Sequence, residues 1–192
     1  MTHVSLRVGA LALIAVGAVA CGSGAPVASS STAPSSAPSA AAATYTDFDT
    51  AFCGSFTNLI RAVGNPDAGT PSVLSKKLDD AVKAGDSLAA EQAAAAMLRE
   101  LETGRQQAGA AARWQPAAET MAQMDRLLAA FEAMTVAKRA VATHTPGAVD
   151  PQKAFEAAGG VVAWSAVLQG VSTLPIPSGA VPRDCPAMRG QA

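Results

Sequence analysis

Hydrophobic residues recur at steps of three and four over much of residues 45–174, the period of an α-helix that buries one side. The first such stretch predicts a helix from about Asp47 to Val63. Gly64-Asn65-Pro66 follows it directly, and this sequence is expected to end the helix. The apolar stripe of this predicted helix consists of Phe48, Phe52, Phe56, Leu59 and Val63.

Two further helices are expected before the middle of the domain. The second is predicted to start near Thr70-Pro71, because proline is favoured in the first turn of a helix. Gly85 marks a break, and Asp86 is a suitable amino-terminal cap for a third helix that runs toward Ala112.

The fourth predicted helix has the strongest pattern. It is expected to open at Pro116 and to end at Thr145-Pro146-Gly147. A last helix should follow the Asp150-Pro151 cap. Apolar residues surround that helix on most sides, which predicts a central position in the bundle. Within it, Gly159-Gly160 predicts a close approach of a neighbouring helix, with a local break as the alternative.

Composition agrees with an all-α fold. Alanine is abundant and clusters of β-branched residues are few, so no strand is expected. Residues 45–192 are long enough for one domain, predicted to be a helical bundle of four to five helices. Prolines in the segment after Leu174 predict an irregular tail; they are Pro175, Pro177, Pro182 and Pro186.

The chain begins with a segment of a different kind. Arg7 precedes an uncharged apolar run from Val8 to Ala20. That run has thirteen residues, whereas a membrane-spanning helix needs about 20. A short basic start, a short apolar run and small residues at its end are typical of a signal peptide, assigned here to residues 1–20.

The tetrapeptide Ala18-Val19-Ala20-Cys21 resembles the lipobox of bacterial lipoproteins, with Ala18 where leucine is commonest. The resemblance implies a lipid on Cys21 and anchoring on the extracytoplasmic face of the cell membrane. Attachment of two or three acyl chains would make the anchor lasting. The alternative is an ordinary secretory signal cut after Ala20, with Cys21 as a free thiol.

Residues 21–44 predict a linker between the anchor and the domain. From Gly22 to Thr44 the chain is built from Ser, Ala, Pro, Thr and Gly with one Val, and it has no charge or aromatic side chain. Such a segment is expected to stay disordered. As a coil it would span roughly 25–30 Å and lift the domain off the bilayer. O-glycosylation of this segment is a second interpretation.

With Cys21 lipidated, Cys53 and Cys185 are the two cysteines left. In an oxidising compartment they are expected to form a disulfide that attaches the tail to the first helix. Two reduced buried thiols are the alternative.

The sequence excludes several functions and leaves others open. A net charge of −1 gives no basic surface for nucleic acid. His144 is the only histidine after the signal peptide, so no histidine zinc site is possible, and no Cys-x-x-Cys replaces it. At a helix end, His144 is expected to interact with the helix dipole rather than to act as a catalytic base. Ser55 is expected to be a small packing residue, and no cofactor is implied.

The stretch Met124 to Met134 and the Cys53/Cys185 arrangement resemble small alanine-rich envelope lipoproteins of actinobacteria, a resemblance that implies no particular activity. The leading hypothesis is a non-catalytic, membrane-anchored protein that binds a protein or a cell-wall component of the envelope. A carrier or sensor of an apolar ligand, with Trp114 or Trp164 at the rim of its pocket, is the alternative. An enzyme is less favoured. Met97, Met121, Met124 and Met134 are interpreted as core residues rather than as copper ligands.

Overall fold

The computed structural model describes residues 42–65, 69–178 and 185. The predicted signal peptide, Cys21 and the linker up to residue 41 lie outside these residues. The described elements are α1 (Tyr45–Val63), β1 (Gly64–Asn65), β2 (Thr70–Pro71), α2 (Val73–Ala84), α3 (Ser87–Ala111), a 3-10 turn (Gln115–Ala117), α4 (Ala118–Ala142), α5 (Pro151–Ala157) and α6 (Gly160–Thr173). The fold is therefore all-α, as expected, apart from one two-stranded hairpin.

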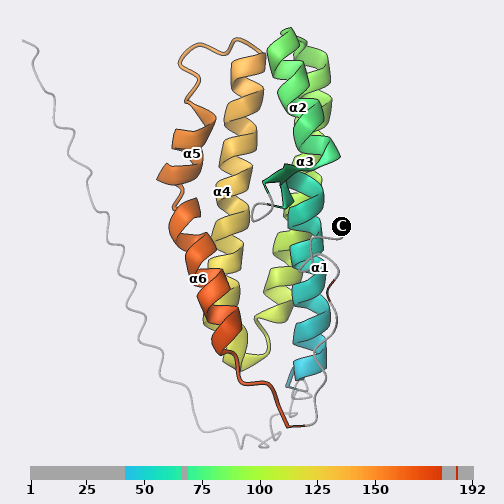
Figure 1. The fold of residues 1–192 in the computed structure, drawn as a ribbon, viewed down its shortest axis with the longest axis vertical. Coiled ribbons are helices and arrows are strands. Elements are labelled where there is room, and N and C mark those ends of the chain that lie inside the picture. The colour runs from blue at the N-terminus through green and yellow to red at the C-terminus, as the bar shows by residue number, and fades with distance from the viewer. Residues whose placement is uncertain (1–41, 66–68, 179–184, 186–192) are drawn as a thin grey trace, which may run out of the picture. The chain divides into compact units, whose positions relative to one another are not determined.

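The helices form an up-down-up-down bundle whose first and last members are each broken (Figure 1). The first column consists of α1 followed by α2, and both pack against α3. The chain returns along α4, which packs against α3, and then descends through α5 and α6, which pack chiefly on α4. The helices α3 and α4 therefore form the central pair, with α1 packed against α3 and α6 packed against α4.

Side-chain caps explain where several helices begin. Thr44 forms a capping box with Asp47, in which each side chain bonds the other residue's backbone N–H. Asp86 accepts a hydrogen bond from the backbone N–H of Ala89 and opens α3. Asp150 does the same for α5 through the N–H of Lys153. The predicted caps at Asp86 and Asp150 are confirmed.

Two apolar clusters make up the core. The larger joins α1, α3, α4 and α6 around Leu59, Leu101 and Leu128, all fully buried. The smaller lies between α2 and α3 around Leu78 and Met97. Met121 and Met124 are also buried in the larger cluster, whereas Met134 packs against it from a half-buried position. The methionines therefore occupy core positions, as their spacing predicted.

The hairpin was not predicted. Gly64 pairs with Pro71 and Asn65 with Thr70 in an antiparallel arrangement. The second helix was expected near Thr70-Pro71, and this is wrong because those residues form β2 and α2 begins at Val73. The physical reason is a better cap, since the Ser72 hydroxyl accepts the N–H of Ser75 at 2.9 Å.

The central position predicted for the last helix is also wrong. The segment is split into α5 and α6, which bend by 56°. Gly159 has a φ of +78° and caps α6 in the left-handed region, and a Cβ at this position would meet open space. The glycine pair is thus a local break rather than the contact site of a neighbouring helix. At Gly160 the close neighbour is the ring of Phe155, from α5 itself.

The predicted ends of the fourth helix also shift. Pro116 lies in the 3-10 turn, and α4 opens two residues later at Ala118. The helix ends at Ala142, before the expected Thr145-Pro146-Gly147. The Thr143 hydroxyl donates to the carbonyl of Arg139 and so bonds the last turn.

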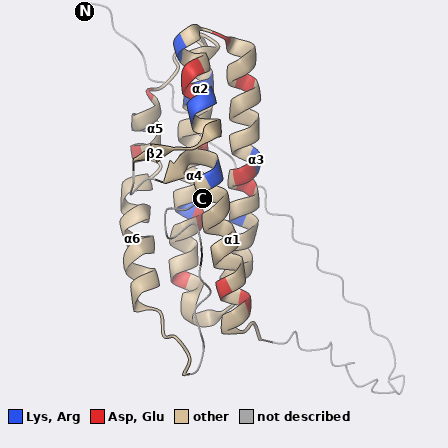
Figure 2. Ribbon diagram, turned by 45° about the vertical axis from the view of Figure 1, so that its right-hand side comes forward, with Lys and Arg blue, Asp and Glu red and all other residues tan. Residues whose placement is uncertain are grey.

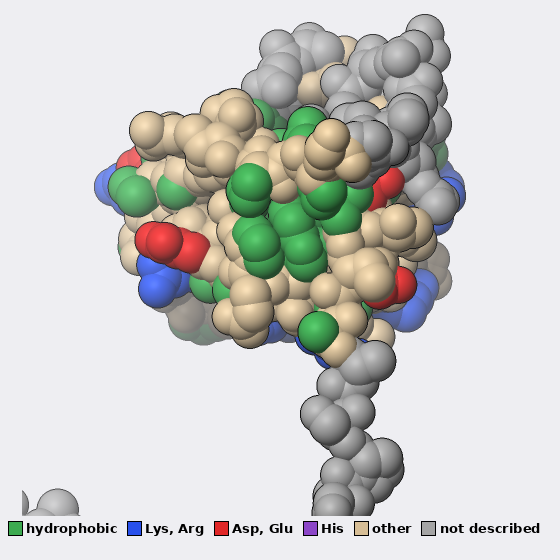
Figure 3. Space-filling view, turned by 90° about the horizontal axis from the view of Figure 1, so that it is seen from below, with side chains coloured by type: hydrophobic (Ala, Val, Ile, Leu, Met, Phe, Trp, Pro, Cys, Tyr) green, Lys and Arg blue, Asp and Glu red, His purple; other side chains and the backbone are tan. Residues whose placement is uncertain are grey.

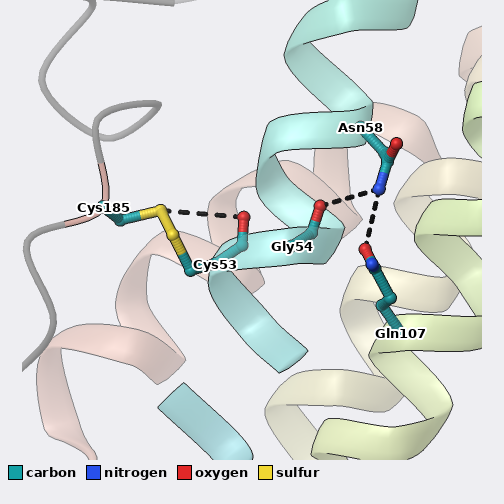
Figure 4. The surroundings of a disulfide bond; sticks show 5 residues. All are labelled: Cys53, Gly54, Asn58, Gln107 and Cys185. Carbon is teal, nitrogen blue, oxygen red and sulfur yellow. Dashed lines mark hydrogen bonds between the residues drawn. A yellow bond between two sulfur atoms is a disulfide. The ribbon is translucent and has the colours of Figure 1, made fainter. Parts of the chain in front are cut away.

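The predicted disulfide is present. Cys53 of α1 is bonded to Cys185, and their Cα atoms are 5.5 Å apart (Figure 4). Beside it, the Asn58 amide donates to the carbonyl of Gly54 at 2.9 Å and to the side-chain oxygen of Gln107 at 2.7 Å. This bond from Asn58 to Gln107 joins α1 to α3 next to the attachment point of the tail.

Candidate functional site

The most unusual surface of the described domain belongs to α6. This helix contains no Asp, Glu, Lys or Arg between Gly160 and Thr173. Figure 2 shows it without charge along its length, whereas α2 and α3 carry both signs. A surface helix normally presents charged or polar residues to water. An uncharged edge helix is thus the first place to look for a contact surface.

Large aliphatic side chains lie exposed on this helix. Val161 is 56% exposed, Val162 is 73% exposed and Leu168 is 42% exposed. Val161 and Leu168 are two helical turns apart and therefore lie on the same side, with Ser165 between them. We call Val161, Val162, Ser165 and Leu168 the α6 face.

The hydroxyl groups of α6 are used within the helix. Ser165 donates to the carbonyl of Val161, Ser172 to that of Gln169, and Thr173 to that of Gly170. Such local bonds leave these hydroxyls less available to a ligand. On the α6 face, Ser165 therefore offers a ligand only the acceptor side of its hydroxyl.

The opposite side of α6 fixes the helix to the bundle. Ala163 and Val167 are almost fully buried there. Trp164 lies half-buried, with its ring 6.3 Å from that of Phe56 on α1. At Gly170, a Cβ would press against the side chain of Thr120 on α4, so α6 and α4 approach closely. The exposed valines thus stand on a helix that is held in place.

A second candidate is an open cleft of about 450 Å³ at the junction of α1, the hairpin and α2, here called the hairpin cleft. Its lining comprises Ile60, Arg61, Gly64, Asn65, Thr70, Pro71, Ser72, Val73, Leu74 and Glu100. Val73 stands at its edge and is 71% exposed. Four apolar side chains, those of Ile60, Pro71, Val73 and Leu74, meet polar groups in this cleft, among them one cation and one carboxylate.

Two residues build the hairpin cleft. Gly64 has a φ of +103°, and a Cβ there would collide with the carbonyl of Thr70, so glycine is required for the tight pairing. The Ser72 hydroxyl donates to the carbonyl of Ala62 at 2.7 Å and also caps α2. Ser72 therefore bonds the end of α1 to the start of α2.

The charges of the hairpin cleft differ from those elsewhere in the bundle. Arg61 and Glu100 make no ion pair or side-chain hydrogen bond within the described residues. By contrast, Arg105 bonds Asp125 at 2.8 Å and also contacts Glu132. The hydrogen bond that Arg105 donates to Asp125 raises the pKa of Arg105 further above its usual value.

The residues that the sequence suggested for chemistry or ligand binding do not come together at one site in the structure. His144 lies exposed in the turn after α4 with a φ of +51°. Trp114 and Trp164 do not line the hairpin cleft. Ser55 is fully buried, in the packing position expected. In the part of the chain that is described, no three His, Cys, Asp or Glu side chains are grouped to hold a metal ion.

Sequence reasoning missed both candidate surfaces. Apolar residues on most sides of the last helix predict burial in the bundle, whereas the structure exposes several of them on α6. The hairpin cleft depends on two strands of two residues each, too short to give a periodic signal. No single described helix is long and apolar enough to cross a membrane, and α5 with α6 passes such a test only as a bent pair. No protein-family model, curated protein or solved structure matches this chain.

Proposed function

We propose that this chain is an exported lipoprotein, anchored by a lipid on Cys21 to the outer face of the cell membrane. Its helical domain acts as a non-catalytic binding module for another protein of the envelope, and the α6 face is the contact surface. The observation that carries this proposal is the exposure of Val161, Val162 and Leu168 on an uncharged helix. Exposed apolar patches of this kind are typical of interaction surfaces.

The chemistry of the α6 face favours a protein over a cell-wall polymer. A sugar polymer is bound through hydrogen bonds, yet the Ser165 hydroxyl is already bonded to the carbonyl of Val161. Aliphatic side chains spaced two turns apart suit the apolar side of a partner helix, which packs in the groove between them. A protein segment with an exposed aliphatic stripe is therefore the partner that fits.

Site-specific photo-crosslinking tests the contact surface. A photoreactive amino acid at position 162 in the full chain should capture a defined envelope protein in cells that make it. The matched control is position 149, where Val149 is similarly exposed but lies in the α4–α5 connection. Capture of the same protein from both positions, or from neither, would contradict the proposal.

A charge on the α6 face should abolish binding without unfolding the domain. Val162→Lys places an ammonium group in an apolar contact, which requires its costly desolvation. Because Val162 is 73% exposed, the free energy of unfolding should change by less than about 0.5 kcal/mol. Val149→Lys serves as the control and should bind normally. Retained binding by Val162→Lys would exclude the α6 face.

The hairpin cleft supports a second candidate, a carrier of an apolar ligand. Its volume of about 450 Å³ falls within the range of small-molecule pockets, roughly 300–1,000 Å³. Native mass spectrometry with lipid extraction on the purified mature chain would reveal a bound molecule. Val73→Asp should release such a ligand, whereas Val162→Lys should not. A chain that carries no ligand would exclude the carrier and leave the binding module.

The anchor has its own test. Cys21→Ala removes the thiol to which the lipid is attached, so the protein should shift from the membrane fraction to the medium or remain as unprocessed precursor. Mature-sized Cys21→Ala protein that stays membrane-bound would contradict lipidation.

A further inference from the structure

One end of the bundle differs from the other in its chemistry. At this end α1 begins, α3 passes into α4 and α6 finishes, so three separate parts of the chain meet (Figure 1). Seen end-on, apolar side chains gather in the middle, and charged side chains lie toward the edge (Figure 3). This end is also where the described chain starts, at Ala42.

Aromatic and aliphatic residues make up the apolar part of this end. The rings of Tyr45 and Trp114 meet edge-on with centroids 5.3 Å apart, and both side chains are half-buried. Leu174 is half-buried against the core beyond α6, and Ile176 is 55% exposed. We call Tyr45, Trp114, Leu174 and Ile176 the end face.

The charges at this end are mostly acidic. Asp47 and Asp49 lie in the first turns of α1 and Glu119 in the first turn of α4, with Arg113 between α3 and α4. Hydrogen bonds from Thr44 lower the pKa of Asp47 and keep that carboxylate ionised. This end therefore lacks the basic residues that attract anionic lipids, and its affinity for a surface must come from apolar contact.

The attachment of the chain brings this end close to the proposed anchor. Residues 22–41 separate Cys21 from Ala42 and reach at most about 70 Å when fully extended. The coil expected from their composition spans about 25 Å. By comparison, α3 alone has 25 residues and is about 38 Å long. The end that carries Ala42 is thus the part of the domain held nearest the bilayer.

We propose that the end face docks on the surface of the bilayer that holds the Cys21 lipid. The inference rests on the anchor of the proposed function and adds an orientation to it. Tyrosine and tryptophan favour the membrane–water interface because their rings are apolar and their polar groups stay hydrated. Ile176, in the segment that follows α6 at this end, supplies a further exposed aliphatic side chain for the interface.

Because the lipid on Cys21 and the linker hold the domain near the bilayer, a weak contact between the end face and the bilayer is enough to orient the domain. Linking two sites by a short chain raises their effective concentration, so that a contact too weak to hold a free protein on a membrane persists in the linked one. Docking at this end leaves the α6 face, which lies along the side of the bundle, open to a partner. The two surfaces therefore do not compete.

The two tryptophans provide an internal test. The lipidated mature chain is reconstituted in phosphatidylcholine vesicles whose acyl chains are brominated near the headgroup, a quencher of tryptophan emission. Trp164→Phe leaves Trp114 as the only tryptophan, and its emission should be quenched and shifted to the blue. Trp114→Phe leaves Trp164, on the side of the bundle, and its emission should be unchanged. Circular dichroism checks that both variants are folded.

The outcomes separate this inference from the proposed function. A mature chain without a lipid on Cys21 would contradict both the proposed anchor and the proposed docking. A lipidated chain on the vesicles with unquenched Trp114 would overturn the docking alone. Quenching of Trp164 in place of Trp114 would also overturn it, because the domain would then lie on its side.

Two further measurements test which residues and which forces make the contact with the bilayer. Ile176→Asp should reduce the quenching of Trp114 while the chain stays bound to vesicles, and Val149→Asp should leave it unchanged. Anionic lipid should weaken the quenching because the carboxylates of Asp47, Asp49 and Glu119 are repelled. Quenching that grows with the anionic fraction would contradict an apolar contact.

Discussion

The two sides of this bundle are held by different means. On the α1 side, a stripe of phenylalanines is buried, the Asn58 amide bonds Gln107 of α3, and the disulfide attaches the tail. On the α5–α6 side, no residue of α5 is buried, and α6 buries only small side chains and Val167. The α6 side also exposes the largest aliphatic residues of its helix.

Under the proposed function, this difference would separate the residues that stabilise the fold from those that contact a partner. Residues that bury apolar area and satisfy polar groups inside the α1–α3 interface stabilise the fold. Residues on the α6 face contribute little to this stability, which leaves them available for a partner. Substitutions on the α1 side should therefore change stability more than substitutions on the α6 side.

Loss of the disulfide should have the largest effect. Replacing both Cys53 and Cys185 with serine removes a bridge across a separation of 132 residues, which in the chain-entropy model costs up to about 5 kcal/mol and in practice about 2–5 kcal/mol. Urea unfolding of the exported chain measures it. Reductant should destabilise the native protein and leave the double variant unchanged; equal stability of the two oxidised proteins would contradict the prediction.

Matched leucine truncations come next. Leu59→Ala, at a fully buried position of α1, should cost about 2–5 kcal/mol because it leaves a cavity in the larger cluster. Leu168→Ala, at a position 42% exposed on α6, should cost less than about 1 kcal/mol. Thermal melts of the two variants compare them directly. A similar cost for both would mean that α6 is as tightly packed as α1.

The polar contact between α1 and α3 should have an intermediate effect. Asn58→Ala removes the donor to Gln107 and leaves that half-buried amide without its partner, at a cost of about 1–3 kcal/mol. The double variant with Gln107→Ala should cost less than the sum of the two single changes. On the α6 side, Ser165→Ala should change stability by less than about 0.5 kcal/mol.

The smallest effect concerns Ser55 and has the opposite sign. Its hydroxyl is fully buried and has no hydrogen-bond partner within the described residues. Ser55→Ala removes that desolvated group and should raise the free energy of unfolding by up to about 1 kcal/mol. Thr135→Val is the control, because the Thr135 hydroxyl donates to the carbonyl of Phe131 at 2.8 Å and its loss should destabilise. A destabilised Ser55→Ala variant would indicate a bonded hydroxyl.

The same comparison shows what the sequence could predict. The stripe from Phe48 to Val63 has one apolar side, so helical periodicity placed both α1 and its buried face correctly. Cysteine parity predicted the disulfide because pairing depends on compartment and number. For α6, the lack of charge was equally clear, yet it does not say whether another part of the same chain or a second molecule covers the helix.

Short structural features could not be predicted from the hydrophobic periodicity of the sequence. Each strand of the hairpin has two residues, too few for an alternation that could be recognised. The break at Gly159 and the hairpin cleft depend on single backbone conformations, which a glycine permits but does not require. The end face includes Tyr45 and Trp114, which lie far apart in the sequence and whose ring contact only the fold establishes.

The bridge between Cys53 and Cys185 also has a mechanical consequence. A pull on the amino-terminal side can unwind α1 only as far as residue 52, because the covalent bond then carries the tension. From Cys53 the force passes through sulfur to Cys185 and back along residues 174–185 to the end of α6. If the proposed anchor and the proposed partner on α6 pulled against each other, this short covalent branch would carry the load, and the packed helices between residues 54 and 159 would be spared.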